Sequence, residues 1–124
     1  MVANKLPRSE EIKMTIALIC PHSFEDYKII EQELLKNENI TKLMCATSNA
    51  CKFAKIFSEK HNIEYYREER GGKVFNLRKI VQMADKVVLF EYSQRDETKY
   101  SLTQKALSES IRLKKDMQYI EYKR

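Results

Sequence analysis

The chain has 124 residues, of which 43% are hydrophobic and 33% are charged. This length suits one domain with a core of its own, and the composition excludes a disordered polymer and a membrane bundle. The net charge of +5 is modest, and the basic residues are interspersed with acidic ones, which argues against a nucleic-acid partner.

Residues 1–13 contain Pro7 and two glutamates and lack an apolar stretch, so we expect a polar tail there rather than a signal peptide. Residues 14–124 are expected to form the domain. No apolar run approaches the ~18 residues of a membrane span, so we expect no membrane partner. Three cysteines, an odd number, do not make a disulfide framework, and we expect reduced thiols in a cytoplasmic protein.

Short apolar runs, typical of buried strands, alternate with segments whose apolar residues recur every three or four positions, as in helices. In chain order we predict a strand over 15–20, a helix over 23–37, a strand over 40–45, a helix over 48–62, a strand over 63–66, a helix over 74–84, a strand over 87–90, a helix over 98–114 and a strand over 117–122. Ser23, Thr47 or Ser48, and Thr98 are the expected N-caps of the first, second and fourth helices.

This alternation predicts a parallel sheet that is covered by helices on both faces. Because crossovers are right-handed, few topologies remain, and we predict a single Rossmann-like α/β domain with a five-stranded parallel sheet in the order 3-2-1-4-5. In that order the chain reverses direction between the first and fourth strands. Ligands bind beside such a switch point at the carboxyl ends of the strands, so residues 20–23, 45–49 and 91–98 are the expected site.

The loop after the first strand reads Cys20-Pro21-His22-Ser23-Phe24-Glu25-Asp26-Tyr27. It resembles the SLOG superfamily, in particular its small YspA-like members. In these proteins the first strand ends in Gly-Ser-Arg, which is followed by Asp-Phe and then Asp-Tyr. Phe24, Asp26 and Tyr27 match this pattern, and Cys-Pro-His stands in place of Gly-Ser-Arg.

Later segments extend the resemblance over residues 14–122. Cys45-Ala46-Thr47-Ser48-Asn49-Ala50-Cys51 stands where the family has Gly-Gly-Ala-Arg-Gly-Ala-Asp, with only the second alanine retained. Asn76 with Ala84-Asp85 resembles an Arg-Asn and Ala-Asp pair of the family, and Glu97-Thr98 resembles its Gly-Thr. The Pro-Gly-Gly-x-Gly-Thr-x-x-Glu motif of the catalytic members has no counterpart, so phosphoribohydrolase activity is not expected.

The resemblance implies that the chain binds a nucleotide or a nucleotide-derived small molecule, without catalysis and without a further cofactor. Glycines would let backbone N–H groups approach a phosphate, so their loss predicts altered contacts and weaker binding. Ser48 and Thr98 stand at expected helix N-termini, which favour anions, although they could serve only as caps. The predicted ligand-binding residues are His22, Ser23, Thr47, Ser48, Asn49, Arg78, Ser93 and Thr98.

Other functions stay open at this point. A hydrolase or transferase acting on a nucleotide would need a carboxylate near the switch point, for which Glu91 and Asp26 are the candidates. The lost glycines are also compatible with a protein-interaction module that no longer binds a ligand, and a homo-oligomer is left open. Single-stranded nucleic acid could stack on exposed tyrosines, but the charge is weak for that partner.

Two further clusters of side chains are candidates for a site. Cys20, His22, Cys45 and Cys51 could in principle hold zinc, but their spacings match no zinc signature, so no metal is expected. The basic residues around the loop after the third strand suit a phosphate or a carboxylate, although acidic residues between them favour a solvated surface. These basic residues are Arg67, Arg70, Lys73 and Arg78.

Overall fold

A computed structural model describes residues 13–92 and 102–122 of the chain. Within these residues, the strands form one parallel sheet in the order β3-β2-β1-β4-β5, which confirms the predicted Rossmann-like α/β architecture. The elements are, in chain order, β1 (Met14–Ile19), α2 (Tyr27–Leu34), β2 (Ile40–Cys45), α3 (Ser48–His61), β3 (Glu64–Arg67), α4 (Lys73–Met83), β4 (Lys86–Tyr92), α5 (Leu102–Arg112) and β5 (Asp116–Tyr122).

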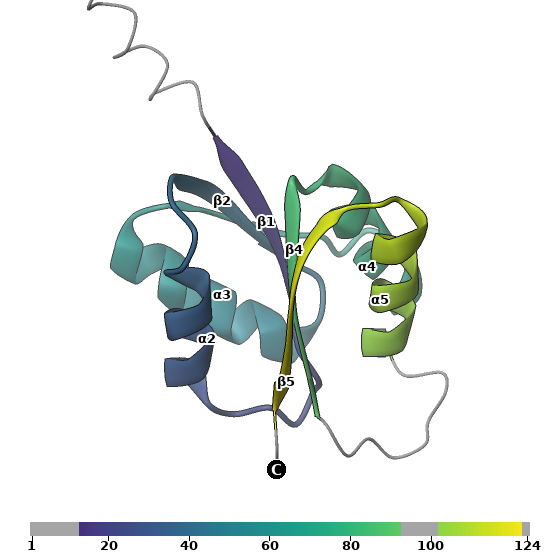
Figure 1. The fold of residues 1–124 in the computed structure, drawn as a ribbon, viewed down its shortest axis with the longest axis horizontal. Coiled ribbons are helices and arrows are strands. Elements are labelled where there is room, and N and C mark those ends of the chain that lie inside the picture. Colours follow the sequence, from purple (N-terminus) through teal and green to yellow (C-terminus); the bar gives the residue numbers. More distant parts are fainter. Residues whose placement is uncertain (1–12, 93–101, 123–124) are drawn as a thin grey trace, which may run out of the picture.

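The helices cover both faces of the sheet, with α2 and α3 on one side and α4 and α5 on the other (Figure 1). This division follows from right-handed crossovers, because the chain builds outward from β1 to β3 and then returns across the sheet to β4. The segments that follow β1 and β4 therefore leave toward opposite faces. The switch point lies between the carboxyl ends of these two strands.

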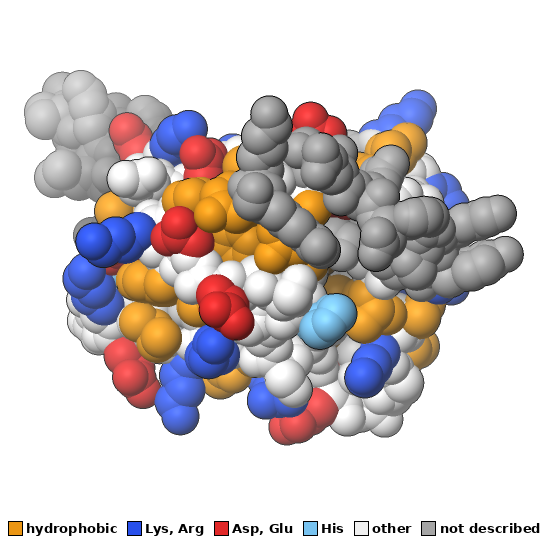
Figure 2. All heavy atoms as spheres, turned by 90° about the horizontal axis from the view of Figure 1, so that it is seen from below, with side chains coloured by type: hydrophobic (Ala, Val, Ile, Leu, Met, Phe, Trp, Pro, Cys, Tyr) orange, Lys and Arg blue, Asp and Glu red, His pale blue; other side chains and the backbone are white. Residues whose placement is uncertain are grey.

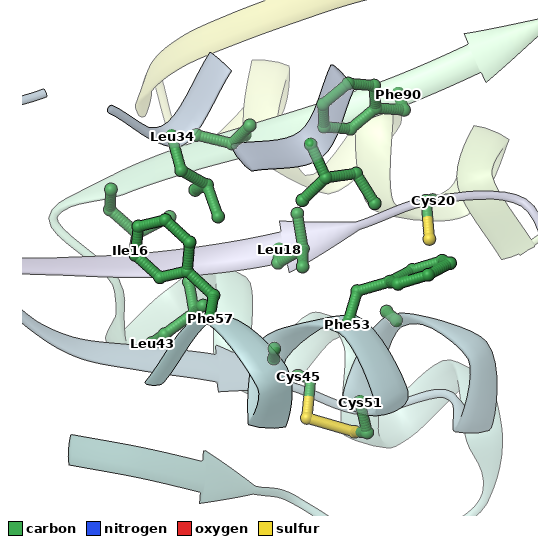
Figure 3. Packing of buried hydrophobic residues seen from close by; sticks show 14 of the residues in the cluster. Ile16, Leu18, Cys20, Leu34, Leu43, Cys45, Cys51, Phe53, Phe57 and Phe90 are labelled. Carbon is green, nitrogen blue, oxygen red and sulfur yellow. A yellow bond between two sulfur atoms is a disulfide. The ribbon is translucent and has the colours of Figure 1, made fainter. Parts of the chain in front are cut away.

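Residues of β1 alternate between two hydrophobic layers of the core. Ile16 and Leu18 belong to the layer under α2 and α3, whereas Ala17 and Ile19 belong to the layer under α4 and α5. A strand that is buried on both faces must be apolar along its length, which explains the continuous run in the sequence. Figure 3 shows side chains of α3 pointing toward β1. The apolar residues that recur with helical spacing along α3 and along α4 with its C-cap are buried: Ala50, Phe53, Ala54, Phe57, Leu77, Ile80, Val81 and Ala84.

The start of α2 differs from the prediction. Ser23 does not cap this helix; Asp26 does, and its Oδ1 accepts a 3.4 Å hydrogen bond from the backbone N–H of Ile29. Residues before Asp26 instead form a turn in which the N–H of Phe24 donates to the carbonyl of Pro21. The side chain of Phe24 is almost fully buried, so the segment that was predicted to be a first helical turn is held as a packed loop.

The strands at the edges of the sheet are β3 and β5, in agreement with the predicted strand order. β4 is longer than predicted and spans Lys86–Tyr92. Among the described residues, no helix combines the length and the apolar character needed to cross a membrane.

Candidate functional site

Because all five strands are parallel, their carboxyl ends meet at one edge of the sheet, which Figure 2 views directly. Hydrophobic side chains gather on this face, and charged side chains lie around them. His22 and Ser23 follow β1 and are exposed, and Thr47 and Ser48 follow β2. The structure thus brings these four predicted residues to the same edge. Two further predicted residues, Ser93 and Thr98, lie outside the described part of the chain.

Helix α3 begins at this edge without a side-chain cap. Thr47 is its N-cap residue, with extended φ and ψ of −110° and 153°, and its carbonyl accepts the first intrahelical hydrogen bond from Cys51 at 2.8 Å. The first N–H groups of a helix have no intrahelical acceptor, so those of Ser48, Asn49 and Ala50 point out of the helix end. The Thr47 hydroxyl is buried and has no hydrogen-bond partner among the described residues. This end of α3 therefore presents several hydrogen-bond donors to whatever lies in front of it.

Asn49 lies at the same edge, in the first turn of α3, and its side chain contacts the loop after β1. Its side-chain amide nitrogen donates to the carbonyl oxygens of Phe24, at 2.7 Å, and Pro21, at 3.0 Å, and lies 3.8 Å from the Cys20 sulfur. The amide thereby fixes the β1–α2 loop against α3. Asn49 positions the loops of the site, and its side-chain nitrogen is occupied by the protein itself.

The expectation of three reduced thiols is wrong for two of the cysteines. Cys45 and Cys51 form a disulfide bond, with their Cα atoms 5.2 Å apart, and only Cys20 stands outside it. The pairing is possible because Cys45 ends β2 and Cys51 lies in the first turn of α3, which brings the two Cβ atoms to one side of the turn. Figure 3 shows the bridge below the hydrophobic layer formed with β1.

Aromatic side chains hold the β1–α2 loop from the opposite flank. The ring of Phe24 lies 4.9 Å from that of Tyr122 and 6.2 Å from that of Tyr92, measured between centroids. The hydroxyl of Ser23 lies 3.4 Å from the Tyr92 hydroxyl, and Asp26 lies 3.5 Å from that of Tyr122. Asp26, one candidate for a catalytic carboxylate, is thus occupied as a helix cap and as a partner of β5.

Glu91, the other candidate carboxylate, is buried near the end of β4, where one of its oxygens accepts a 2.8 Å hydrogen bond from the side chain of Gln104. Gln104 belongs to α5, so the contact joins the strand to the helix that covers it. A buried carboxylate that accepts from an amide is a structural tie between two elements. The sequence pointed to Glu91 by its place at the strand end, but Gln104 carries no local signal.

Arg78 is the predicted site residue that lies elsewhere. It projects from the middle of α4 with its Nε 4.0 Å from the carboxylate of Glu109 in α5. Glu109 also accepts hydrogen bonds from Arg112 and Gln82, so this buried carboxylate gathers the polar side chains between the two helices. Arg78 is part of that contact rather than of the edge where β1 and β2 end.

The loop after β3 contains a third buried carboxylate, whose burial the sequence did not predict. Glu68 is only 1% exposed and accepts hydrogen bonds from Arg70, at 3.0 and 3.3 Å, and from the Tyr66 hydroxyl. These two donors lower the pKa of the Glu68 carboxyl to about 2, with Arg70 the larger influence. Arg67 lies 3.6 Å from Glu69. The arginines considered as anion ligands are thus paired with neighbouring glutamates.

Among the solved structures to which the chain is similar is that of Thermococcus litoralis Delta(1)-pyrroline-2-carboxylate reductase in complex with NADH and L-proline. The two are 22% identical with a TM-score of 0.43, and the match covers 62% of this chain and 23% of that chain. The chain thus corresponds to less than a quarter of the reductase's length. No family model and no curated protein matches this chain.

Proposed function

We propose that the protein binds a nucleotide or a nucleotide-derived small molecule through an anionic group at the N-terminus of α3. The observation that carries the proposal is the start of this helix, where Thr47 provides no side-chain cap and its buried hydroxyl lacks a partner among the described residues. A helix N-terminus favours anions, because its N–H groups point outward and its dipole is positive there. The place also fits, since it adjoins the switch point of an open α/β sheet.

The chemistry of this edge favours binding without catalysis. The carboxylates near it, Asp26 and Glu91, already hold neighbouring elements together. The SLOG-like pattern of the sequence supports a nucleotide as the source of the anionic group. Ala46 and Cys45 carry side chains where that pattern has glycine, so we expect looser contact with a phosphate and modest affinity.

The proposal is tested by native mass spectrometry of the purified protein, followed by calorimetric titration with ADP and AMP. The decisive variant is Ser48→Pro, which removes one backbone N–H at the first helical position. Proline is favoured at that position, and the extended Thr47 suits a residue that precedes proline, so the fold is retained. The matched control is Ser48→Ala, which removes the hydroxyl and keeps the N–H.

We expect Ser48→Pro to weaken binding of the nucleotide by about tenfold or more, because one charge-assisted hydrogen bond is lost, and Ser48→Ala to weaken it far less. Equal binding by the proline variant and the wild type would show that the anion lies elsewhere. Substitution of Asn49 is unsuitable for this test, because its side chain holds the loop after β1.

A further inference from the structure

The Cys45–Cys51 disulfide joins the two ends of the turn that starts α3. The closed ring contains Thr47, the N-cap residue whose hydroxyl has no partner among the described residues, and Ser48, the first residue of the helix. Any change in the bond between the two sulfurs therefore acts on the segment to which the proposed function assigns the anion. No other described turn of the sheet is closed covalently.

Reduction of the Cys45–Cys51 bond must change the geometry of the turn, because the two sulfur atoms must move apart. Bonded sulfurs lie about 2.05 Å apart, whereas non-bonded heavy atoms settle at about 3.5–4.0 Å, so the two thiols must separate by more than about 1 Å. Cys45 is 0% and Cys51 2% exposed, and protein interiors hold few voids that could accept such a movement. Part of the surrounding structure must move instead.

The two sides of the bridge differ in how firmly they are held. Cys45 belongs to β2, which is hydrogen-bonded to β1 on one side and to β3 on the other, and its sulfur lies 3.8 Å from the Tyr65 hydroxyl. Cys51 belongs to the first turn of α3, which begins at the exposed Ser48. Because the sheet is the more constrained partner, the first helical turn is the part that shifts.

We propose that the Cys45–Cys51 pair is a redox switch that sets the geometry of the α3 N-terminus, and hence the affinity of the site assigned there under the proposed function. In the reaction a dithiol reductant breaks the S–S bond and supplies two electrons and two protons. Cys45 and Cys51 become thiols, and the reductant becomes a disulfide. The oxidised form holds the N–H groups of the helix end in a fixed array, which favours ligand binding by preorganisation.

Cys20 does not interfere with this exchange. It is buried beside the amide of Asn49, and burial raises the pKa of its thiol to about 12. Because only a thiolate attacks a disulfide, Cys20 stays inert. The reaction is therefore confined to one pair of sulfurs.

The first test needs no ligand. The full chain is purified without reductant, and thiols are counted after denaturation, with one per chain expected before reduction and three after it. Hydrogen exchange of the backbone amide of residue 51, which donates to the carbonyl of Thr47 at 2.8 Å, is then measured in both forms. We expect exchange to be at least tenfold faster after reduction. The variant Cys45→Ser/Cys51→Ser should exchange as fast as the reduced wild type and ignore the reductant, and Cys20→Ser should respond like the wild type.

Three thiols per chain before reduction, or equal exchange in the two forms, would overturn the proposal. Titration with ADP then separates it from the proposed function. Faster exchange after reduction with no ADP binding in either form leaves the switch and removes the nucleotide site. ADP binding of equal strength to both forms keeps the site and contradicts its redox control. Binding at least tenfold tighter in the oxidised form supports both.

Discussion

The side-chain amide of Asn49 donates a 2.7 Å hydrogen bond to the backbone carbonyl of Phe24, 25 positions earlier in the chain. The bond joins the first turn of α3 to the loop after β1, and it places two of the segments that form the edge of the sheet in a fixed relation. A second bond from the same nitrogen reaches Pro21. The side chain of Asn49 therefore holds the two loops together. Glycine-rich loops at the same place in a βα unit instead let the backbone approach a bound phosphate.

Replacement of Asn49 by alanine should destabilise the protein by about 1–3 kcal/mol, because two carbonyl groups lose their donor in a half-buried place. Urea denaturation measures the loss as a lower midpoint with an unchanged slope. Ser48→Ala is the control, since its side chain is exposed and it neighbours Asn49 in the same helical turn. A change below about 0.5 kcal/mol in the Asn49 variant, in the range of ordinary surface substitutions, would contradict the role of its amide.

Reduction of the Cys45–Cys51 bond should lower the free energy of unfolding by about 2 kcal/mol. The disulfide closes a short ring, with a sequence separation of six, and the loss of closure entropy in the unfolded chain is small for short rings. Urea denaturation with and without a dithiol reductant gives the difference, and Cys20→Ser should show the same shift on reduction as the wild type. A protein that is equally stable in both forms would exclude a stabilising role for the bond.

The buried carboxylate of Glu68 should make stability depend on pH in the acid range. Hydrogen bonds from Arg70 and Tyr66 lower its folded-state pKa to about 2, below the ordinary value of 4.5. Its contribution is therefore complete above pH 4.5 and is lost as the pH falls toward 2. Compared with Glu68→Gln, the wild type should be more stable at pH 7, and this advantage should shrink between pH 4.5 and 2.

Glu69→Gln provides the control for this measurement, since the side chain of Glu69 is 71% exposed and lies 3.6 Å from Arg67. Exposed ion pairs contribute little to stability, so its pH profile should follow that of the wild type. If Glu68→Gln and the wild type lose stability in parallel from pH 7 to pH 2, the carboxylate is not held in its charged form by these donors.

The fold could be predicted from the sequence because its signals are local. β1 is a short and nearly continuous apolar run, and the apolar residues of α3 and α4 recur with helical spacing, so the type and order of the elements follow from short segments. The two strands with weaker hydrophobic patterns, β3 and β5, lie at the edges of the sheet, where a strand is less buried. The alternation of elements and the handedness of crossovers then leave the observed strand order.

The details of the site depended on contacts between distant segments, which the sequence does not display. Ser23 and Asp26 are both good N-cap residues. Asp26 caps the helix because Phe24, which is buried and accepts a hydrogen bond from Asn49, holds the preceding residues in a loop. The basic residues near Arg78 in the sequence predicted that it binds an anion. In the structure it lies beside the carboxylate of Glu109, 31 positions later. The number of cysteines does not indicate that Cys45 and Cys51 come together across the β2–α3 turn.

Lys114, which follows the end of α5, adopts a left-handed backbone conformation with φ of 55°. Its N–H donates to the carbonyl of Ile111, and the next N–H, that of Lys115, donates to Ser110, so the helix ends in hydrogen bonds that require this conformation. For a residue with a Cβ atom the left-handed region costs about 1–2 kcal/mol, which glycine avoids. Lys114→Gly should therefore raise the free energy of unfolding by about 1 kcal/mol, measured by urea denaturation.

Asn62→Gly is the matched comparison, because Asn62 ends α3 with φ of 57°, and asparagine tolerates this region better than lysine. The gain at Lys114 should exceed that at Asn62, and the reverse order would show that side-chain contacts, rather than backbone strain, decide the stability of these two helix ends.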